Sequence, residues 1–246
     1  IKYQMLTSLK KTNFFKRVFI FNTLLFFSFY FFYLSFPNFD IYFSNLFFYE
    51  GKFLADKYIF IKGLRTFLKN LMIIIPIMAL VTLVIFKINK QQKILFKKKK
   101  YNSKRTFFVL VGLIVGPIVG CGIIANLYFK DTWGRARPIN IVEFNGNKMY
   151  TPPFARSDQC DKNCSWIGGE VAGAYSLLVG LFLLRNYLFI KLCFTFGLLV
   201  FFCRTAMGGH FLSDNLFSII LMIYLALAYR FLVIKYFIRN TFKKND

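Results

Sequence analysis

Long apolar runs separated by short polar stretches dominate the chain. The runs cover residues 18–36, 68–86, 107–125, 171–184, 188–203 and 216–234. A helix needs about 20 mostly apolar residues to cross a bilayer, and a helix that faces protein neighbours tolerates some polar residues among them. The pattern predicts an all-α, polytopic membrane protein with six transmembrane helices. No small-residue cleavage site follows the first run, so we expect an uncleaved anchor and not a signal peptide.

Charge is distributed unevenly among the polar stretches. Six spans place both termini on one side, and that side receives many basic residues: Lys10, Lys11, Lys16, Arg17, the block 87–105, "RNYLFIK" and the tail "RNTFKKND". All the acidic residues except Asp246 fall in the opposite loops or beside them: Asp40, Glu50, Asp56, Asp131, Glu143, Asp158, Asp161, Glu170 and Asp214. Because cytoplasmic loops are enriched in Lys and Arg, we predict cytoplasmic termini in a bacterial inner membrane and acidic loops in the periplasm.

Composition excludes an ordinary soluble domain. The chain is 57% hydrophobic and 21% aromatic, yet it carries 33 Lys and Arg against 10 Asp and Glu. Nucleic-acid binding is disfavoured, because the basic residues lie at the ends of apolar runs and not on polar helices or sheets. Topology and contact with anionic inner-leaflet lipid account for much of the net charge.

A single domain over residues 1–246 is predicted, without a linker or a convincing repeat. Residues 37–66 mix aromatic rings with scattered charges, which suits a periplasmic segment on the outer leaflet; a packed surface turn is the alternative. The third run carries small residues at four-residue spacing: Gly112, Gly116 and Gly120. They predict close helix packing, with a functional kink at Pro117 as the alternative.

Two of the five cysteines, Cys160 and Cys164, lie in the long polar loop 129–170. A pair that faces an oxidising periplasm favours a local disulfide over two free thiols. A metal site is the alternative, but no histidine or further cysteine lies nearby to complete its ligands. We therefore predict no metal and no cofactor.

Two groups of polar residues flank this loop. Lys130 and Arg137 are seven residues apart and would share a helix face if the third helix continued between them. Gly168 and Gly169 precede Glu170 at the start of the fourth run, where glycines and a helix N-terminus favour the approach of an anion.

A third group contains Arg204, His210 and Asp214 at the junction of the fifth and sixth runs. Each group alone has an ordinary explanation as a helix end, a turn or a structural pair. Together they place three cations, a histidine and two carboxylates at one membrane depth on one side. Ionisable residues at such a depth are functional candidates.

The first and third groups resemble the signature of the type 2 phosphatidic acid phosphatases, a superfamily that also contains vanadium haloperoxidases. The first part matches at Lys130 and Arg137, followed by proline, and the third part matches at Arg204, His210 and Asp214. The resemblance also implies a helical bundle with the active site at the periplasmic face.

The middle part of the signature departs from the usual Pro-Ser-Gly-His, because this chain ends the segment in Glu170 and His210 is its only histidine. A branch that includes bacterial lipid A phosphatases acting at the 4′ position is similar in carrying a glutamate there after an "NCS" segment. Residues 163–165 fit that form, and "FPNFDIYFSNLFFYEGKFLADK" is also similar to the branch. The motifs, which lie within 130–214, thus favour a lipid A type substrate over a simple phosphatidate.

The resemblance implies in-line attack of His210 on the phosphorus to give a phosphohistidine that water hydrolyses. Asp214 would hold the other ring nitrogen, and Glu170 would protonate the leaving alkoxide. Cations and backbone N–H groups would bind the phosphate oxygens: Lys130, Arg137, Arg204, Gly168 and Gly169. Arg135 and Asp131 are expected to lie behind the site or to face solvent.

The sequence thus favours an integral-membrane phosphatase that acts on a lipid phosphate. Undecaprenyl pyrophosphate and phosphatidylglycerol phosphate are alternative substrates, and transfer of the phosphate to another lipid is an alternative reaction. A lipid or anion transporter would instead have broken helices that meet near the midplane. A haloperoxidase would need no spanning helices. The oligomeric state is not predicted.

Overall fold

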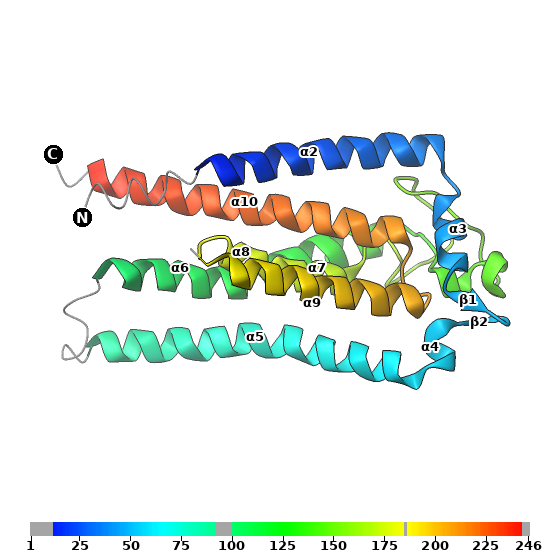
Figure 1. The fold of residues 1–246 in the computed structure, drawn as a ribbon, viewed down its shortest axis with the longest axis horizontal. Helices are drawn as coiled ribbons and strands as arrows, with labels where there is room; N and C mark the ends of the chain where they lie inside the picture. Colours follow the sequence, from blue (N-terminus) through cyan, green and yellow to red (C-terminus); the bar gives the residue numbers. More distant parts are fainter. Residues whose placement is uncertain (1–11, 92–99, 185, 243–246) are drawn as a thin grey trace.

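The computed structural model describes residues 12–91, 100–184 and 186–242. Five long helices run along one axis and form a bundle (Figure 1): α2 (Thr12–Ser35), α5 (Ile59–Gln91), α6 (Lys100–Pro117), α9 (Tyr187–Ala206) and α10 (Leu212–Phe242). The predicted all-α membrane architecture is therefore confirmed. Some of the basic residues predicted to lie in the cytoplasm are outside the described residues: Lys10, Lys11, 92–99 and 243–246.

Within the described residues, five segments are long and apolar enough to cross a membrane: Asn13–Ser35, Ile59–Phe86, Lys104–Lys130, Tyr187–Ala206 and Leu212–Tyr236. Large apolar side chains on their outer faces, such as Phe21 and Phe60, are exposed as lipid contact requires. These five segments are one fewer than the six predicted transmembrane helices. The fourth predicted run instead forms a shorter apolar helix, Gly169–Leu181.

The third span changes from an α-helix to a π-helix partway along. The α-helix α6 ends at Pro117, and the π-helix η1 continues the span over Ile118–Lys130. The change begins directly after the proline, which removes one helical N–H donor. The helix ends before Arg137, which has extended backbone in front of the short 3₁₀ helix η2 (Pro138–Asn140). The predicted continuous helix from Lys130 to Arg137 is therefore wrong.

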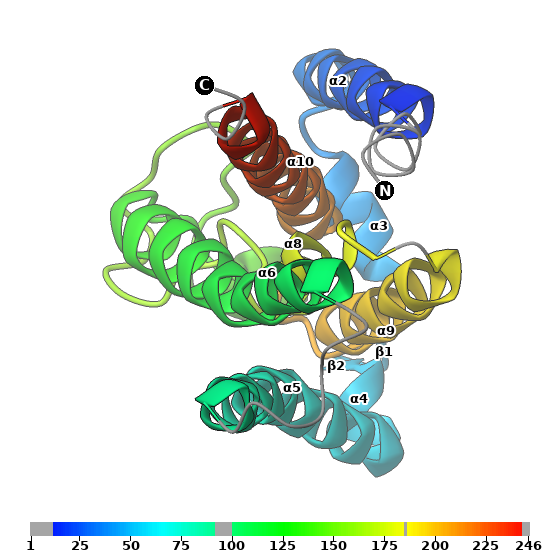
Figure 2. The ribbon, with the colours of Figure 1, turned by 90° about the vertical axis from the view of Figure 1, so that its left-hand side faces the viewer.

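The fourth apolar run forms α7 (Gly169–Ser176) and α8 (Leu178–Leu181) (Figure 1), and Figure 2 shows α8 between α6, α9 and α10. Most of its residues are buried against α6, η1, α9 and α10. A Cβ on Gly116 would come within 2.3 Å of the Ser176 carbonyl oxygen. The glycines at 112 and 120 make similarly close approaches to α8 and α10, which confirms the packing interpretation.

Short elements gather at one end of the bundle, opposite the start of α2 and the end of α10 (Figure 1). They are α3 (Phe39–Asn45), the antiparallel pair β1 (Phe48–Tyr49) and β2 (Lys52–Phe53), α4 (Leu54–Lys57), η2 and η3 (Val142–Phe144). Because α5 already begins at Ile59, the last part of the predicted outer segment 37–66 belongs to a spanning helix. Beneath this end, Trp166 stacks on Phe217 of α10 with ring centroids 5.0 Å apart.

Candidate active site

His210 lies in the turn between α9 and α10, at the end of the bundle that carries the short elements. Its Nδ1 is 2.9 Å from the carbonyl oxygen of Ser165. A carbonyl only accepts, so this contact places the ring proton on Nδ1 of a neutral histidine. The buried Nε2 has no hydrogen-bond partner among the described residues. The lone pair on Nε2 is therefore available to a substrate.

The surroundings of His210 favour its neutral form. Burial lowers the pKa of His210 well below the ordinary value of 6.5, and the charges of Lys130, Arg204 and Arg137 lower it further. The ring is consequently uncharged at neutral pH, with a proton on Nδ1 and none on Nε2. A nucleophilic imidazole requires this state.

Asp214 orients the histidine differently from the expectation. Its carboxylate accepts hydrogen bonds from Arg135 Nη1 at 2.6 Å and from the Phe211 N–H at 2.8 Å. It also accepts from the Ser165 hydroxyl at 2.5 Å. Its Oδ2 lies 3.7 Å from His210 Nδ1, beyond hydrogen-bond distance. Asp214 therefore fixes Ser165, whose carbonyl in turn holds the ring.

A buried ion network lies behind Asp214. Arg135 has no exposed surface and donates from Nη2 to Asp40 at 2.7 Å, so Asp40 and Asp214 share one guanidinium. Tyr33 and the Ser213 N–H each donate to Asp40 at 2.9 Å. The expectation for Arg135 left open whether it lay behind the site or faced solvent, and it lies behind the site. Sequence reasoning did not assign Asp40, whose only signal is a lone acid in an aromatic stretch.

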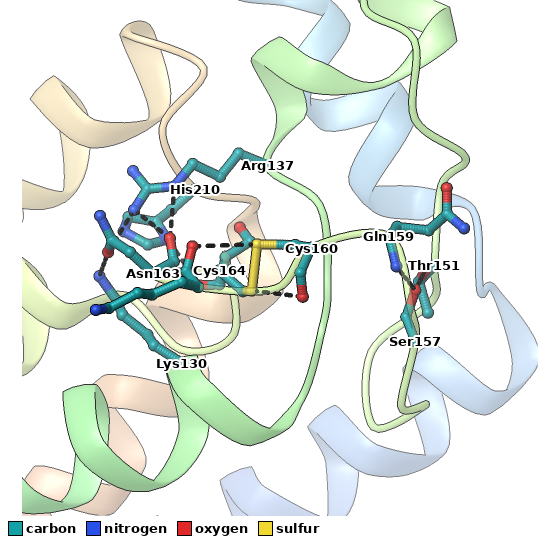
Figure 3. Close-up of a disulfide and its surroundings, with 11 residues drawn as sticks. Lys130, Arg137, Thr151, Ser157, Gln159, Cys160, Asn163, Cys164 and His210 are labelled. Carbon is teal, nitrogen blue, oxygen red and sulfur yellow. Dashed lines mark hydrogen bonds between the residues drawn. A yellow bond between two sulfur atoms is a disulfide. The ribbon is translucent and has the colours of Figure 1, made fainter.

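Lys130 and Arg137 both contact Asn163 (Figure 3). Lys130, at the end of η1, donates to Asn163 Oδ1 at 3.4 Å. Arg137 Nη2 donates to the backbone oxygen of Asn163 at 2.8 Å and to its Oδ1 at 2.9 Å. Although the helix between the two cations ends, the loop returns Arg137 to the side of Lys130. Asp131, in contrast, is exposed.

Arg204 reaches the site from the last turn of α9. Its side chain is buried, and its Nε has no acceptor among the described residues. A Cβ on Gly209 would lie 2.5 Å from Arg204 Nη2, so only glycine lets the guanidinium come this close to the backbone beside His210.

Glu170 is paired with arginines. Arg65 of α5 donates from Nε to Glu170 Oε2 at 2.9 Å and makes a second hydrogen bond from Nη2 to Oε1. Arg204 Nη1 lies 3.7 Å from the same carboxylate. These contacts stabilise the ionised form, whereas a proton donor must be protonated. The geometry therefore opposes the expected role of Glu170 as the general acid. Arg65 was not identified from the sequence, where it is one basic residue beside an apolar run.

The two glycines before Glu170 have different neighbours. A Cβ on Gly169 would lie 2.8 Å from Asn126 Oδ1 and 2.9 Å from Lys130 Nζ, so the absence of a side chain lets the start of α7 pack closely against the lysine. A Cβ on Gly168 would lie 2.3 Å from Asn215 Oδ1, so packing against α10 already requires glycine there. The Gly168 N–H donates to the Asp214 carbonyl oxygen at 3.1 Å, so the expected phosphate contact from this N–H is already taken. The N–H groups in the first turn of α7 have no partner within the helix, and an anion would have to bind there.

Cys160 and Cys164 form a disulfide in the loop beside these cations, with Cα atoms 5.7 Å apart (Figure 3). Across the described part of the chain, no group of three or more His, Cys, Asp or Glu side chains is arranged to hold a metal ion.

Three lipid A 4′-phosphatases are similar to this chain over part or most of its length. It is 35% identical over 193 residues to the lipid A 4′-phosphatase of Francisella tularensis subsp. novicida, covering 76% of this chain and 82% of that protein. The lipid A 4′-phosphatase of Rhizobium leguminosarum is 27% identical over 196 residues, covering 73% and 81%. That of Rhizobium etli is 28% identical over 120 residues, covering 46% and 45%.

No solved structure matches the chain. The PAP2 superfamily matches residues 105–238, which include every residue of the three signature motifs and more than half of the chain. The chain therefore belongs to the PAP2 superfamily.

Proposed function

We propose that this protein is a membrane phosphatase that removes the 4′-phosphate monoester of lipid A. The observation that carries the proposal is the unpartnered Nε2 of His210, with Lys130, Arg137 and Arg204 close enough to disfavour its protonation. The relatives named as lipid A 4′-phosphatases support the choice of substrate. Cations around a free nucleophile suit a phosphate dianion.

In the proposed mechanism, His210 Nε2 attacks the phosphorus in line with the bond to the sugar oxygen. That bond breaks, its electron pair stays on the sugar oxygen, which takes a proton from water, and the phosphoryl group becomes bound to Nε2. Lys130, Arg137 and Arg204 bind the equatorial oxygens, where charge is concentrated in the transition state. Water then hydrolyses the phosphohistidine and releases inorganic phosphate.

Glu170 is assigned to the second step. Its pairing with Arg65 keeps it ionised, and only an ionised carboxylate can take the proton of the attacking water. Replacement of Glu170 by Gln should then slow hydrolysis of the intermediate, and labelled phosphoenzyme should accumulate. Slow formation of the intermediate without accumulation would return Glu170 to the role of proton donor.

For the topology, we propose six crossings of a bacterial inner membrane, with α7 and α8 as the buried fourth crossing. The described chain ends lie at one end of the bundle and the His210 turn at the other (Figure 1). Basic residues at the end of the bundle where α2 and α6 begin, such as Lys16 and Lys104, support a cytoplasmic location for that end. The active site would then face the periplasm.

The function is tested with purified protein and a panel of lipid phosphates: lipid A phosphorylated at position 1 or 4′, phosphatidylglycerol phosphate and undecaprenyl pyrophosphate. We expect phosphate release from 4′-phosphorylated lipid A and none with His210→Ala. Equal activity of the wild type and His210→Ala would exclude the enzymatic mechanism. Release from another lipid alone would change the substrate, and label transferred to an added acceptor lipid would identify a transferase.

A further inference from the structure

Asn163 is the point at which two cations of the site meet. Its side-chain oxygen accepts from Lys130 Nζ and Arg137 Nη2, and its backbone oxygen accepts from Nε and Nη2 of the same arginine, at 3.2 and 2.8 Å. Three of these four contacts are shorter than 3.3 Å and are well-formed hydrogen bonds. Asn163 therefore sets the position of the Arg137 guanidinium with two acceptors at once.

The chemistry of an asparagine suits this place. Lys130 and Arg137 repel each other, and a shared acceptor offsets part of that repulsion. The amide oxygen is neutral, so both cations keep their full charge for a phosphate. An aspartate at the same position would form ion pairs with them and would compete with the substrate. Among the described residues, neither Lys130 nor Arg137 forms an ion pair with a carboxylate.

The backbone around Asn163 is fixed on both sides. Its φ of 52° is in the left-handed region, which asparagine tolerates better than most residues. The next N–H, that of Cys164, donates to the Lys130 carbonyl at 3.2 Å, and the disulfide to Cys160 closes the loop at that residue. The residue after it, Ser165, holds His210. Three consecutive residues thus connect the cations, the disulfide and the nucleophile.

We propose that Asn163, held by the Cys160–Cys164 disulfide loop, is a positioning residue that presents Lys130 and Arg137 as one phosphate-binding pair. The proposal rests on the phosphatase function for its use of phosphate. It does not depend on which lipid carries that phosphate.

Binding of inorganic phosphate to the full-length protein in detergent tests this role without a lipid substrate. Asn163→Gly keeps the left-handed backbone and the backbone acceptor but deletes the side chain, and we expect about tenfold weaker binding. Asn163→Asp has the same shape, and we expect still weaker binding because it adds a competing charge. The control is Asp161→Ala, an exposed position in the same loop, with wild-type affinity expected.

A merely structural role predicts the opposite order, because the isosteric aspartate would disturb the fold less than glycine does. Phosphate binding by Asn163→Asp at the wild-type affinity would overturn the proposal, whether or not Asn163→Gly folds. If the wild type binds phosphate with the expected order of variants but hydrolyses no lipid, the positioning role stands and the proposed function fails.

Discussion

At the scale of single residues, His210 offers a direct measurement because it is the only histidine in the chain. Protein labelled with ¹⁵N-histidine therefore gives one imidazole signal. Burial and the charges of Lys130, Arg204 and Arg137 lower the pKa of His210, while the backbone oxygen of Ser165 raises it by a smaller amount. We expect a titration midpoint below 6.5 and the proton on Nδ1 at neutral pH.

The sign of this shift sets the expected pH dependence. In the proposed mechanism the neutral ring is the nucleophile, so activity should persist to a lower pH than a histidine with the ordinary pKa of 6.5 would allow, and should fall as the pH drops through the lowered pKa. A midpoint at or above 6.5, or a ring proton on Nε2, would contradict the geometry. Labelled His210→Gln protein, which lacks the signal, confirms its assignment.

The residues that were missed share a physical feature. Asp40 and Arg65 each pair with a residue that is distant in sequence, at separations of 95 residues for Asp40 with Arg135 and 105 for Arg65 with Glu170. Local patterns carry no information about such pairs. His210 and Arg204, in contrast, share one short motif with fixed spacing and could be singled out from the sequence.

At the scale of elements, apolar length predicted the long helices because membrane spanning is a local property of a run. The predicted continuation of the third helix from Lys130 to Arg137 failed for a local reason as well. Gly134 has a φ of 70° and a Cβ there would lie 1.6 Å from the Ser157 carbonyl oxygen, so the chain turns away from the helix axis at a position that requires glycine. The helix of the fourth run ends at Leu181, because Phe182 and Leu183 form a turn.

The contact between α6 and α7 gives a prediction about stability. Gly116→Ala would place a methyl group 2.3 Å from the Ser176 carbonyl oxygen, and backbone cannot move aside as a flexible side chain can. We expect the free energy of unfolding to fall by about 1–3 kcal/mol. The measurement is reversible unfolding in detergent, or the midpoint of thermal unfolding where refolding fails.

Gly122→Ala on the same continuous span is the matched control. Its Cβ would lie 3.9 Å from the nearest atom, the Pro117 carbonyl oxygen, which is ordinary contact. We expect this variant to be as stable as the wild type or slightly more stable. Equal destabilisation by the two substitutions would show that close packing of α6 on α7 is not what requires glycine at 116.

At the scale of the whole molecule, the buried α7–α8 segment determines whether the two described chain ends can lie on the same side of a membrane. Five spans alone would leave the termini on opposite sides, yet the described chain ends lie together (Figure 1). A helix over residues 169–181 is about 20 Å long at 1.5 Å per residue, shorter than the roughly 30 Å apolar core of a bilayer. In the proposed six-span topology, the surrounding helices would allow this short segment to cross, because its ends need not meet lipid.

This arrangement predicts a pattern of chemical labelling in intact bacteria. Met149→Cys, exposed in the loop at the active-site end, should react with a membrane-impermeant maleimide once the reagent has passed the outer membrane. Lys104→Cys, exposed near the start of α6, should react only after the inner membrane is permeabilised. The wild type sets the background, because two of its three free cysteines are buried and Cys121 is partly buried. Reaction of Lys104→Cys in intact cells would place the termini outside and the phosphate-binding cations in the cytoplasm.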